Sequence, residues 1–166
     1  KATGYWIEEA GGQPRFAPLD GERDFDVIVV GGGFTGLWTA YHLKSAEPDL
    51  AVGLIESHRI GHGPSGRNGG FVDAMWVSFA SLVARYGSLP ALKLARASER
   101  SVSQVGEFLD QHGVEAWFRK SGYLNVSTAP AWDGSWDANL KAMREAGIVD
   151  GPRELTPQEV QEICPS

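Results

Sequence analysis

Residues 26–37 have the sequence DVIVVGGGFTGL, and this stretch decides the fold. It contains an unbroken β-branched run, Val27 to Val30, which is typical of a strand buried on both faces in a parallel sheet. Glycines follow the run, and residues 35–45 then have a helical pattern. A second apolar stretch at residues 50–55 ends in Glu56. The order of strand, glycine turn, helix and strand predicts a β-α-β unit.

The glycine turn satisfies the pattern G-x-G-x-x-G through Gly31, Gly33 and Gly36. In a dinucleotide-binding fold these glycines permit a tight turn, a close approach of the backbone to pyrophosphate, and close packing of the helix on the strands. The first helical turn, which includes Phe34 and Thr35, directs free N–H groups and a positive dipole end at the phosphates. The pattern alone is weak evidence, but its position between a buried strand and a helix favours a Rossmann-type unit.

Glu56 stands at the end of the second predicted strand, near the spacing at which an acid accepts hydrogen bonds from the adenosine ribose. Taken alone, it would be interpreted as a solvated carboxylate. With the glycine pattern present, we expect the ribose role, and we include the adjacent Ser57 in the predicted site. An acid here also makes NADP the least favoured nucleotide. Gly53 interrupts the same strand and marks either a close backbone contact or a tolerated residue.

A second glycine-rich stretch, GHGPSGRNGG at residues 61–70, follows shortly after the second strand. A NAD dehydrogenase has no evident need for another glycine loop here, so this stretch favours FAD. Glycine N–H groups can form an anion-binding concavity, and Arg67 can pair with phosphate. The alternatives are that Arg67 is a solvated loop residue and that Asn68 is a turn residue bonded to its own backbone. His58 and His62 match no flavin-attachment motif and are interpreted as ordinary loop histidines.

Residues 26–37 and 61–70 together resemble the FAD-dependent amine and amino-acid oxidoreductases, the glycine oxidase and D-amino-acid oxidase superfamily. Within it the chain looks most like the γ-glutamylputrescine oxidoreductase branch, whose Ser-Gly-Arg-Asn-Gly-Gly loop matches residues 65–70. The resemblance implies an enzyme with FAD as cofactor that oxidises a C–N bond of a small amine or amino acid to an imine by hydride transfer to the flavin. The loop residues to which it gives a cofactor-binding role are Ser65, Gly66, Arg67, Asn68, Gly69 and Gly70.

Two other interpretations stay open, an NAD-dependent dehydrogenase domain and a non-catalytic nucleotide-binding fragment. No catalytic residues can be assigned, because the segments that line the substrate face of the flavin in full-length relatives lie mostly beyond Ser166. The sequence begins with Lys1, so the natural N-terminus is expected to lie further upstream.

Helical periodicity dominates the remainder of the chain. We expect helices over residues 78–112, divided near Gly87 to Pro90, over residues 136–146, and after a capping box that begins at Thr156. Residues 114–127 are predicted to be a strand region. The fold class is therefore α/β, a Rossmann-type unit with following helices and the start of a substrate domain, in an incomplete fold.

This pattern divides the chain into an irregular leader pinned by its aromatic residues (1–25), the N-terminal part of the FAD-binding domain (26–112), and the beginning of a substrate domain (113–166). Asp and Glu outnumber Lys and Arg by 21 to 15, so nucleic acid is not an expected partner. No apolar run is long enough to span a bilayer. The single cysteine, Cys164, excludes an internal disulfide and a cysteine-based metal site, which favours a cytoplasmic protein that binds no metal. The oligomeric state is not predicted.

Overall fold

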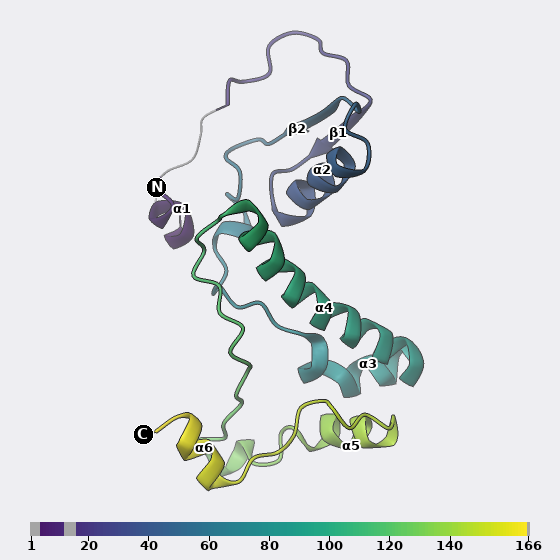
Figure 1. The fold of residues 1–166 in the computed structure, drawn as a ribbon, viewed down its shortest axis with the longest axis vertical. Coiled ribbons are helices and arrows are strands. Elements are labelled where there is room, and N and C mark those ends of the chain that lie inside the picture. The colour runs from purple at the N-terminus through teal and green to yellow at the C-terminus, as the bar shows by residue number, and fades with distance from the viewer. Residues whose placement is uncertain (1–3, 12–15, 166) are drawn as a thin grey trace. The chain divides into compact units, whose positions relative to one another are not determined.

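The structure is a computed structural model that describes residues 4–11 and 16–165. It has a mixed α/β fold and divides into two compact units, Lys1–Phe71 and Val72–Ser166. Figure 1 shows the order of the elements along the chain.

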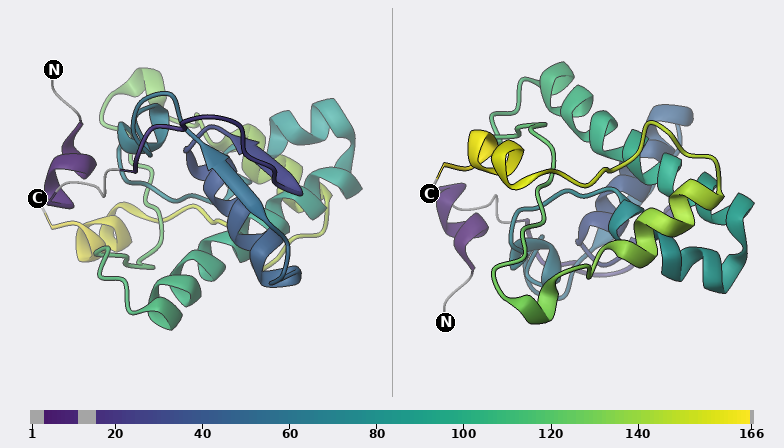
Figure 2. Two further views of the ribbon diagram at one scale, coloured as in Figure 1. Left: turned by 90° about the horizontal axis from the view of Figure 1, so that it is seen from above. Right: turned by 90° about the horizontal axis from the view of Figure 1, so that it is seen from below.

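The first unit contains the β-α-β arrangement that residues 26–56 predict. Its strands pair in parallel, with Val27 opposite Val52 and Val30 opposite Ile55. Helix α2 connects them and contacts both, and Figure 2 shows it running alongside the strands. The elements of this unit are α1 (Tyr5–Glu9), β1 (Val27–Val30), α2 (Phe34–Ala46), β2 (Val52–Ile55) and the 3-10 turn η1 (Pro64–Gly66).

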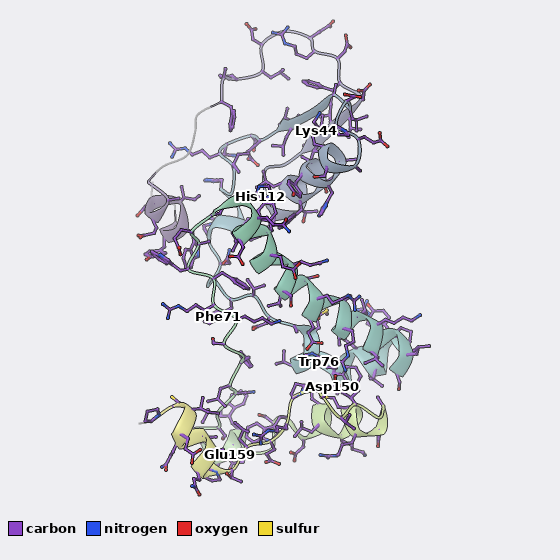
Figure 3. The ribbon with its side chains drawn as sticks, viewed as in Figure 1. Lys44, Phe71, Trp76, His112, Asp150 and Glu159 are labelled. Carbon is purple, nitrogen blue, oxygen red and sulfur yellow. The ribbon has the colours of Figure 1, made fainter. Side chains whose placement is uncertain are left out.

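Side chains near the strand ends fix the register of this small sheet. The Asp26 carboxylate accepts a 2.8 Å hydrogen bond from the N–H of Ala51, immediately before β2. Lys44, labelled in Figure 3, donates to the carbonyl of Leu50 at 3.0 Å and so ties the end of α2 to the following turn. A Cβ on Gly53 would lie 2.9 Å from the ring of Phe25. Of the two interpretations of Gly53, the structure therefore supports close contact.

The leader is not irregular throughout, as the sequence suggested. Its residues Tyr5–Glu9 form helix α1, and Ile7 on this helix is 6% exposed. A single helical turn is too short to produce a recognisable period in the sequence, and this one is stabilised by packing of Trp6 and Ile7 against residues far along the chain. Residues 16–25 are irregular as expected, whereas residues 12–15 lie outside the described part of the chain.

The second unit is helical, and its helices match the sequence prediction closely. The break between α3 and α4 falls at Gly87, which has a φ of 82°. Gly113 ends α4 in the left-handed conformation, as a C-terminal glycine should. Thr156 and Glu159 form the predicted capping box of α6. The elements are η2 (Met75–Ser78), α3 (Phe79–Tyr86), α4 (Ser88–His112), η3 (Pro130–Trp132), α5 (Asp137–Glu145) and α6 (Pro157–Ile163).

The core of the second unit lies where η2, α3, α4 and α5 meet. Phe79 is completely buried there, and Met143 of α5 packs into the same cluster. Arg96 lies over the ring of Trp76 at 5.0 Å and forms an ion pair with Asp150. This contact holds the pKa of Asp150 below its usual value, and Figure 3 labels both Trp76 and Asp150.

Residues 114–127 do not form the strand region that their composition suggested; they contain no strand. Trp117 and Gly122 have φ angles of 53° and 87°, which interrupt an extended backbone. The segment makes contacts with α4 instead, where a Cβ on Gly106 would lie 2.7 Å from the ring of Phe118. A β-rich composition alone cannot produce a strand when no neighbouring strand accepts the ladder hydrogen bonds.

No helix in the described residues is both long enough and apolar enough to cross a membrane.

Candidate functional site

The first glycine loop connects β1 to α2 and depends on glycine at Gly31 and Gly36. Gly31 has a φ of 104°, and the space where its Cβ would project is open. Gly33 is the N-cap of α2. A Cβ on Gly36 would lie 2.0 Å from the carbonyl oxygen of Gly31, so Gly36 is the residue that lets the helix approach the turn. The positive φ of Gly31 and the close packing of Gly36 agree with the turn and packing roles expected of them, whereas the approach of Gly33 to a pyrophosphate stays a prediction.

The N-terminus of α2 presents backbone donors at this loop. The N–H of Phe34 donates to the Ser65 hydroxyl at 3.0 Å, and that of Leu37 donates to the Gly33 carbonyl at 3.0 Å. For the N–H groups of Thr35 and Gly36, the described residues supply no acceptor. Free N–H groups in the first turn of a helix, at the positive end of its dipole, are suited to an anion.

Glu56 follows β2 and lies against the first glycine loop. Its Oε2 accepts a 2.8 Å hydrogen bond from the N–H of Gly32, and its Oε1 accepts one of 2.9 Å from the N–H of His58. The Ser57 hydroxyl donates to the same Oε1 at 3.3 Å. These bonds, the one from Gly32 above all, keep the pKa of Glu56 below its ordinary value. The carboxylate is thus held in its charged form beside the glycine turn.

The second glycine loop meets the first in two places: the N–H of Gly61 donates to the carbonyl of Gly32 at 2.8 Å, and Ser65 contacts Gly33 and Phe34. Besides accepting from Phe34, Ser65 sits so close to the first loop that a Cβ on Gly33 would lie 3.0 Å from its hydroxyl oxygen. Further along, the Asn68 amide donates to the Ser65 carbonyl at 2.7 Å and accepts from the N–H of Gly70 at 2.8 Å. Asn68 therefore shapes the loop through the loop's own backbone.

The other predicted residues of this loop lie further from the first loop. Gly66 is buried in η1, and Gly69 lies beside the ring of Phe71. Arg67 is exposed at the end of η1, and no carboxylate among residues 4–11 and 16–165 forms an ion pair with it. Its guanidinium is available for an anionic group.

Several residues that the sequence did not assign to the site help to build it. The N–H of Gly32 holds Glu56, and a Cβ on Gly32 would lie 2.4 Å from Cδ1 of Ile60. The indole of Trp6 donates to the carbonyl of Asn68 at 2.8 Å. The run of three successive glycines in the sequence indicated that Gly32 belongs to the loop. No sequence pattern indicated that Trp6 or Ile60 contacts either glycine loop.

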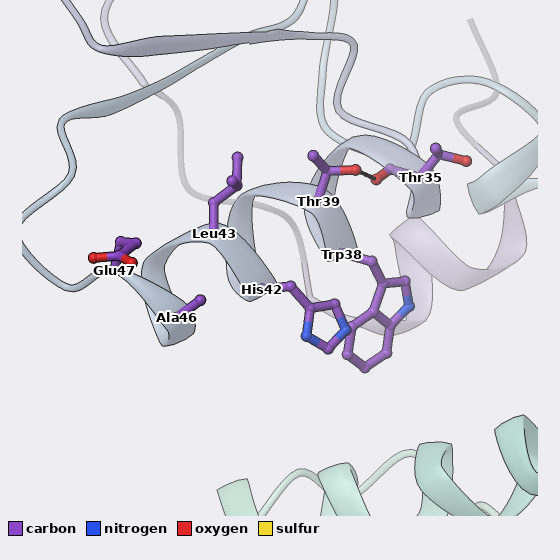
Figure 4. A pocket seen from close by; sticks show the side chains of 7 residues that line it. All are labelled: Thr35, Trp38, Thr39, His42, Leu43, Ala46 and Glu47. Atoms are coloured by element: carbon purple, nitrogen blue, oxygen red, sulfur yellow. Dashed lines mark hydrogen bonds between the residues drawn. The ribbon is translucent and has the colours of Figure 1, made fainter.

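A shallow depression also runs along α2, and Figure 4 shows its lining. Trp38 and His42 stack there with ring centroids 5.5 Å apart. Helix α2 and its C-cap residue supply the whole lining, so the depression is open to one side. It differs in this from the region where the two glycine loops meet. Its residues are Thr35, Trp38, Thr39, His42, Leu43, Ala46 and Glu47.

Comparison with known protein families decides what these loops belong to. Residues 26–166 match the family described as FAD dependent oxidoreductase, abbreviated DAO. The chain belongs to this family. The family is FAD-dependent, which resolves the choice between FAD and NAD in favour of FAD and confirms the family resemblance seen in the two loops.

Curated relatives give the same family assignment. The chain is 46% identical over 121 residues to the γ-glutamylputrescine oxidoreductase of Escherichia coli K12, covering 72% of this chain and 28% of that protein. It is 31% identical over 134 residues to the probable oxidoreductase OrdL of Rhizobium meliloti, covering 79% of this chain and 30% of that protein. The chain thus spans less than a third of these relatives. No solved structure gives a significant match.

Proposed function

We propose that the protein containing this chain oxidises a C–N bond of a small amine or amino acid, and that both glycine loops of the first unit bind its FAD. Membership of an FAD-dependent family supports the cofactor. The observation that carries the substrate class is the 46% identity to a protein named γ-glutamylputrescine oxidoreductase.

The residues of the first unit fit a dinucleotide. The turn at Gly31 leaves open space where a side chain would otherwise project, and the packing at Gly36 has no room for even a methyl group. At the start of α2, the N–H groups of Thr35 and Gly36 have no acceptor in the described part of the chain. A turn that carries no side chain at Gly31 and exposes N–H groups is suited to a pyrophosphate.

The role that we assign to each residue follows from its chemistry. The N–H groups of Thr35 and Gly36 would bind the pyrophosphate, and Glu56, which stays ionised, would accept hydrogen bonds from the ribose hydroxyls. Arg67 would add a positive charge from the second loop. Ser65 would hold the two loops at a fixed separation through its bond to Phe34. The same site includes Gly33, Phe34, Ser57, Gly66, Asn68, Gly69 and Gly70 as loop backbone and neighbours.

Bound FAD would supply the two-electron acceptor for the hydride of the carbon that bears the amine, so that the C–N bond of the substrate would become an imine, with loss of a proton from the nitrogen. The residues of this chain contribute by holding the cofactor, and we assign none of them a proton-transfer role.

An anaerobic reduction experiment tests this proposal. The full-length protein, purified without denaturant, should show the absorption bands of oxidised flavin, and these should bleach when γ-glutamylputrescine is added. Free putrescine, which lacks the γ-glutamyl group, tests whether that acyl group is required. A 2-hydroxy acid tests whether the enzyme oxidises a C–O bond in place of a C–N bond. Absence of flavin with no reconstitution by FAD would contradict the cofactor site. Bleaching by the 2-hydroxy acid but by no amine would contradict the substrate class.

A further inference from the structure

The leader helix α1 makes its contacts with the second glycine loop. The indole N–H of Trp6 donates to the carbonyl of Asn68 at 2.8 Å, across a separation of 62 positions in the sequence. This bond joins two segments that flank the whole β-α-β unit along the chain. The carbonyl it engages belongs to the residue whose side chain already organises the loop.

Packing reinforces this hydrogen bond along the length of the helix. A Cβ on Gly70 would lie 2.4 Å from the Trp6 ring, and one on Gly66 would lie 2.9 Å from Cδ1 of Ile7. Ile7 is 6% exposed, and it is the only buried hydrophobic residue within the described part of the first unit. The glycines of the loop therefore serve a second purpose, because larger residues there would push α1 away.

A loop of this composition needs an external anchor. Glycine loses more conformational entropy on ordering than any other residue, and residues 61–70 contain five of them. If the loop is already ordered before the ligand binds, ordering the loop does not reduce the free energy of binding. Within the loop, backbone hydrogen bonds from Gly66 to Gly63 and from Arg67 to Pro64 order residues 63–67, and the Asn68 side chain bonds Ser65 and Gly70 at the two ends of the 65–70 segment.

We propose that helix α1 is a clasp that holds residues 66–70 in the shape that binds FAD, with Trp6 and Ile7 as its positioning residues. The clasp itself rests on the contacts above, and its consequence for FAD rests on the proposed function. Trp6 anchors the backbone of the loop through Asn68 and covers Gly70. Ile7 seals Gly66 at the start of the same segment.

Trypsin provides a readout that does not require the cofactor, because Arg67 is exposed and lies within the clasped segment. The cleavage rate at the Arg67–Asn68 bond, followed by mass spectrometry in the FAD-free full-length protein, should rise more than about tenfold in Trp6→Ala and in Ile7→Ala. Trp6→Phe keeps the aromatic packing and loses the N–H donor, so its rate should rise about fivefold. Trp132→Ala, an exposed tryptophan in the second unit, should cleave at the wild-type rate.

The second measurement is retention of FAD during dialysis, which should fall in the order wild type, Trp6→Phe, Trp6→Ala. Cleavage after Arg85, inside α3, is the internal control and should not change. Unchanged cleavage at Arg67 in Trp6→Ala would overturn the clasp. Faster cleavage with unchanged FAD retention would overturn its role in cofactor binding. A wild-type protein that binds no FAD would contradict the proposed function and leave the cleavage result to decide the clasp.

Discussion

The carboxylate of Glu56 accepts a 2.8 Å hydrogen bond from the backbone N–H of Gly32, which joins the end of β2 to the turn that follows β1. The bond fixes an anion beside a glycine loop that is otherwise suited to binding anions. We infer that the position of the carboxylate is set before any ribose hydroxyl reaches it. A negative charge here also repels a 2′-phosphate, in agreement with a cofactor that lacks one.

We expect Glu56→Gln to weaken FAD binding by about tenfold or more, measured as the dissociation constant in a fluorescence titration. The wild-type carboxylate accepts from Gly32 with one oxygen and from His58 with the other. A glutamine has one acceptor oxygen, and its NH₂ group would face one of these N–H donors. An unchanged dissociation constant would contradict the role of Glu56.

The same substitution should alter how stability depends on pH. Because the pKa of Glu56 is lowered in the folded protein, its contribution is fully present above the ordinary glutamate value and is lost as the pH falls through the lowered value. The stability advantage of wild type over Glu56→Gln should therefore be constant near neutral pH and shrink in acid. Urea unfolding of the FAD-free protein at a series of pH values measures it. An advantage that grows in acid would contradict this assignment.

Ser65→Ala should weaken FAD retention by about fivefold, because the N–H of Phe34 then loses its acceptor in the second loop, although the Gly61–Gly32 backbone bond between the loops remains. The matched control is Ser45→Ala, since the Ser45 hydroxyl bonds the carbonyl of Tyr41 within α2, outside the site. Dissociation of FAD, followed by the recovery of flavin fluorescence after dilution, compares the two variants. Equal rates for both variants would show that the Ser65–Phe34 bond has no part in binding.

Gly36→Ala should destabilise the protein by at least about 2 kcal/mol, because its methyl group would lie 2.0 Å from the Gly31 carbonyl oxygen and the helix would have to move. Gly63→Ala is the control. Gly63 has a φ of −76° and no atom within 4 Å of its Cβ position. That variant should stay within about 0.5 kcal/mol of wild type or gain slightly. Urea unfolding checks both, and equal stabilities would contradict the packing argument.

The β-α-β unit was predictable from the sequence because its signals are local. A β-branched run, a glycine turn and a helical period each depend on neighbouring residues, and β1 and α2 appear where residues 27–45 place them. The helices of the second unit were predictable for the same reason, down to the break at Gly87 and the capping box at Thr156. These features require no knowledge of distant contacts.

Contacts between distant residues could not be read in the same way. The short α1 forms where Trp6 contacts Asn68, which is 62 positions away in the sequence. No local sequence pattern at either residue indicates that the two are in contact. Residues 114–127 have the composition of a strand, yet Trp117 adopts a positive φ and no strand lies alongside in the described residues. The bond between Ser65 and Phe34 likewise depends on the path of the intervening chain.

Asn139 provides a test of the second unit that is independent of the cofactor. Its Oδ1 accepts from the N–H of Ala80 at 2.8 Å, and its Nδ2 donates to the carbonyl of Val77 at 2.6 Å, so one side chain on α5 satisfies both the end of η2 and the start of α3. Asn139→Ala leaves the part-buried N–H of Ala80 and the exposed carbonyl of Val77 without their protein partners and should cost about 1–2 kcal/mol of unfolding free energy. Asn125→Ala, an exposed asparagine in the irregular segment, should stay within about 0.5 kcal/mol of wild type. Urea unfolding followed by far-ultraviolet circular dichroism measures the difference, and a loss no larger than that of Asn125→Ala would mean that water replaces both bonds without cost.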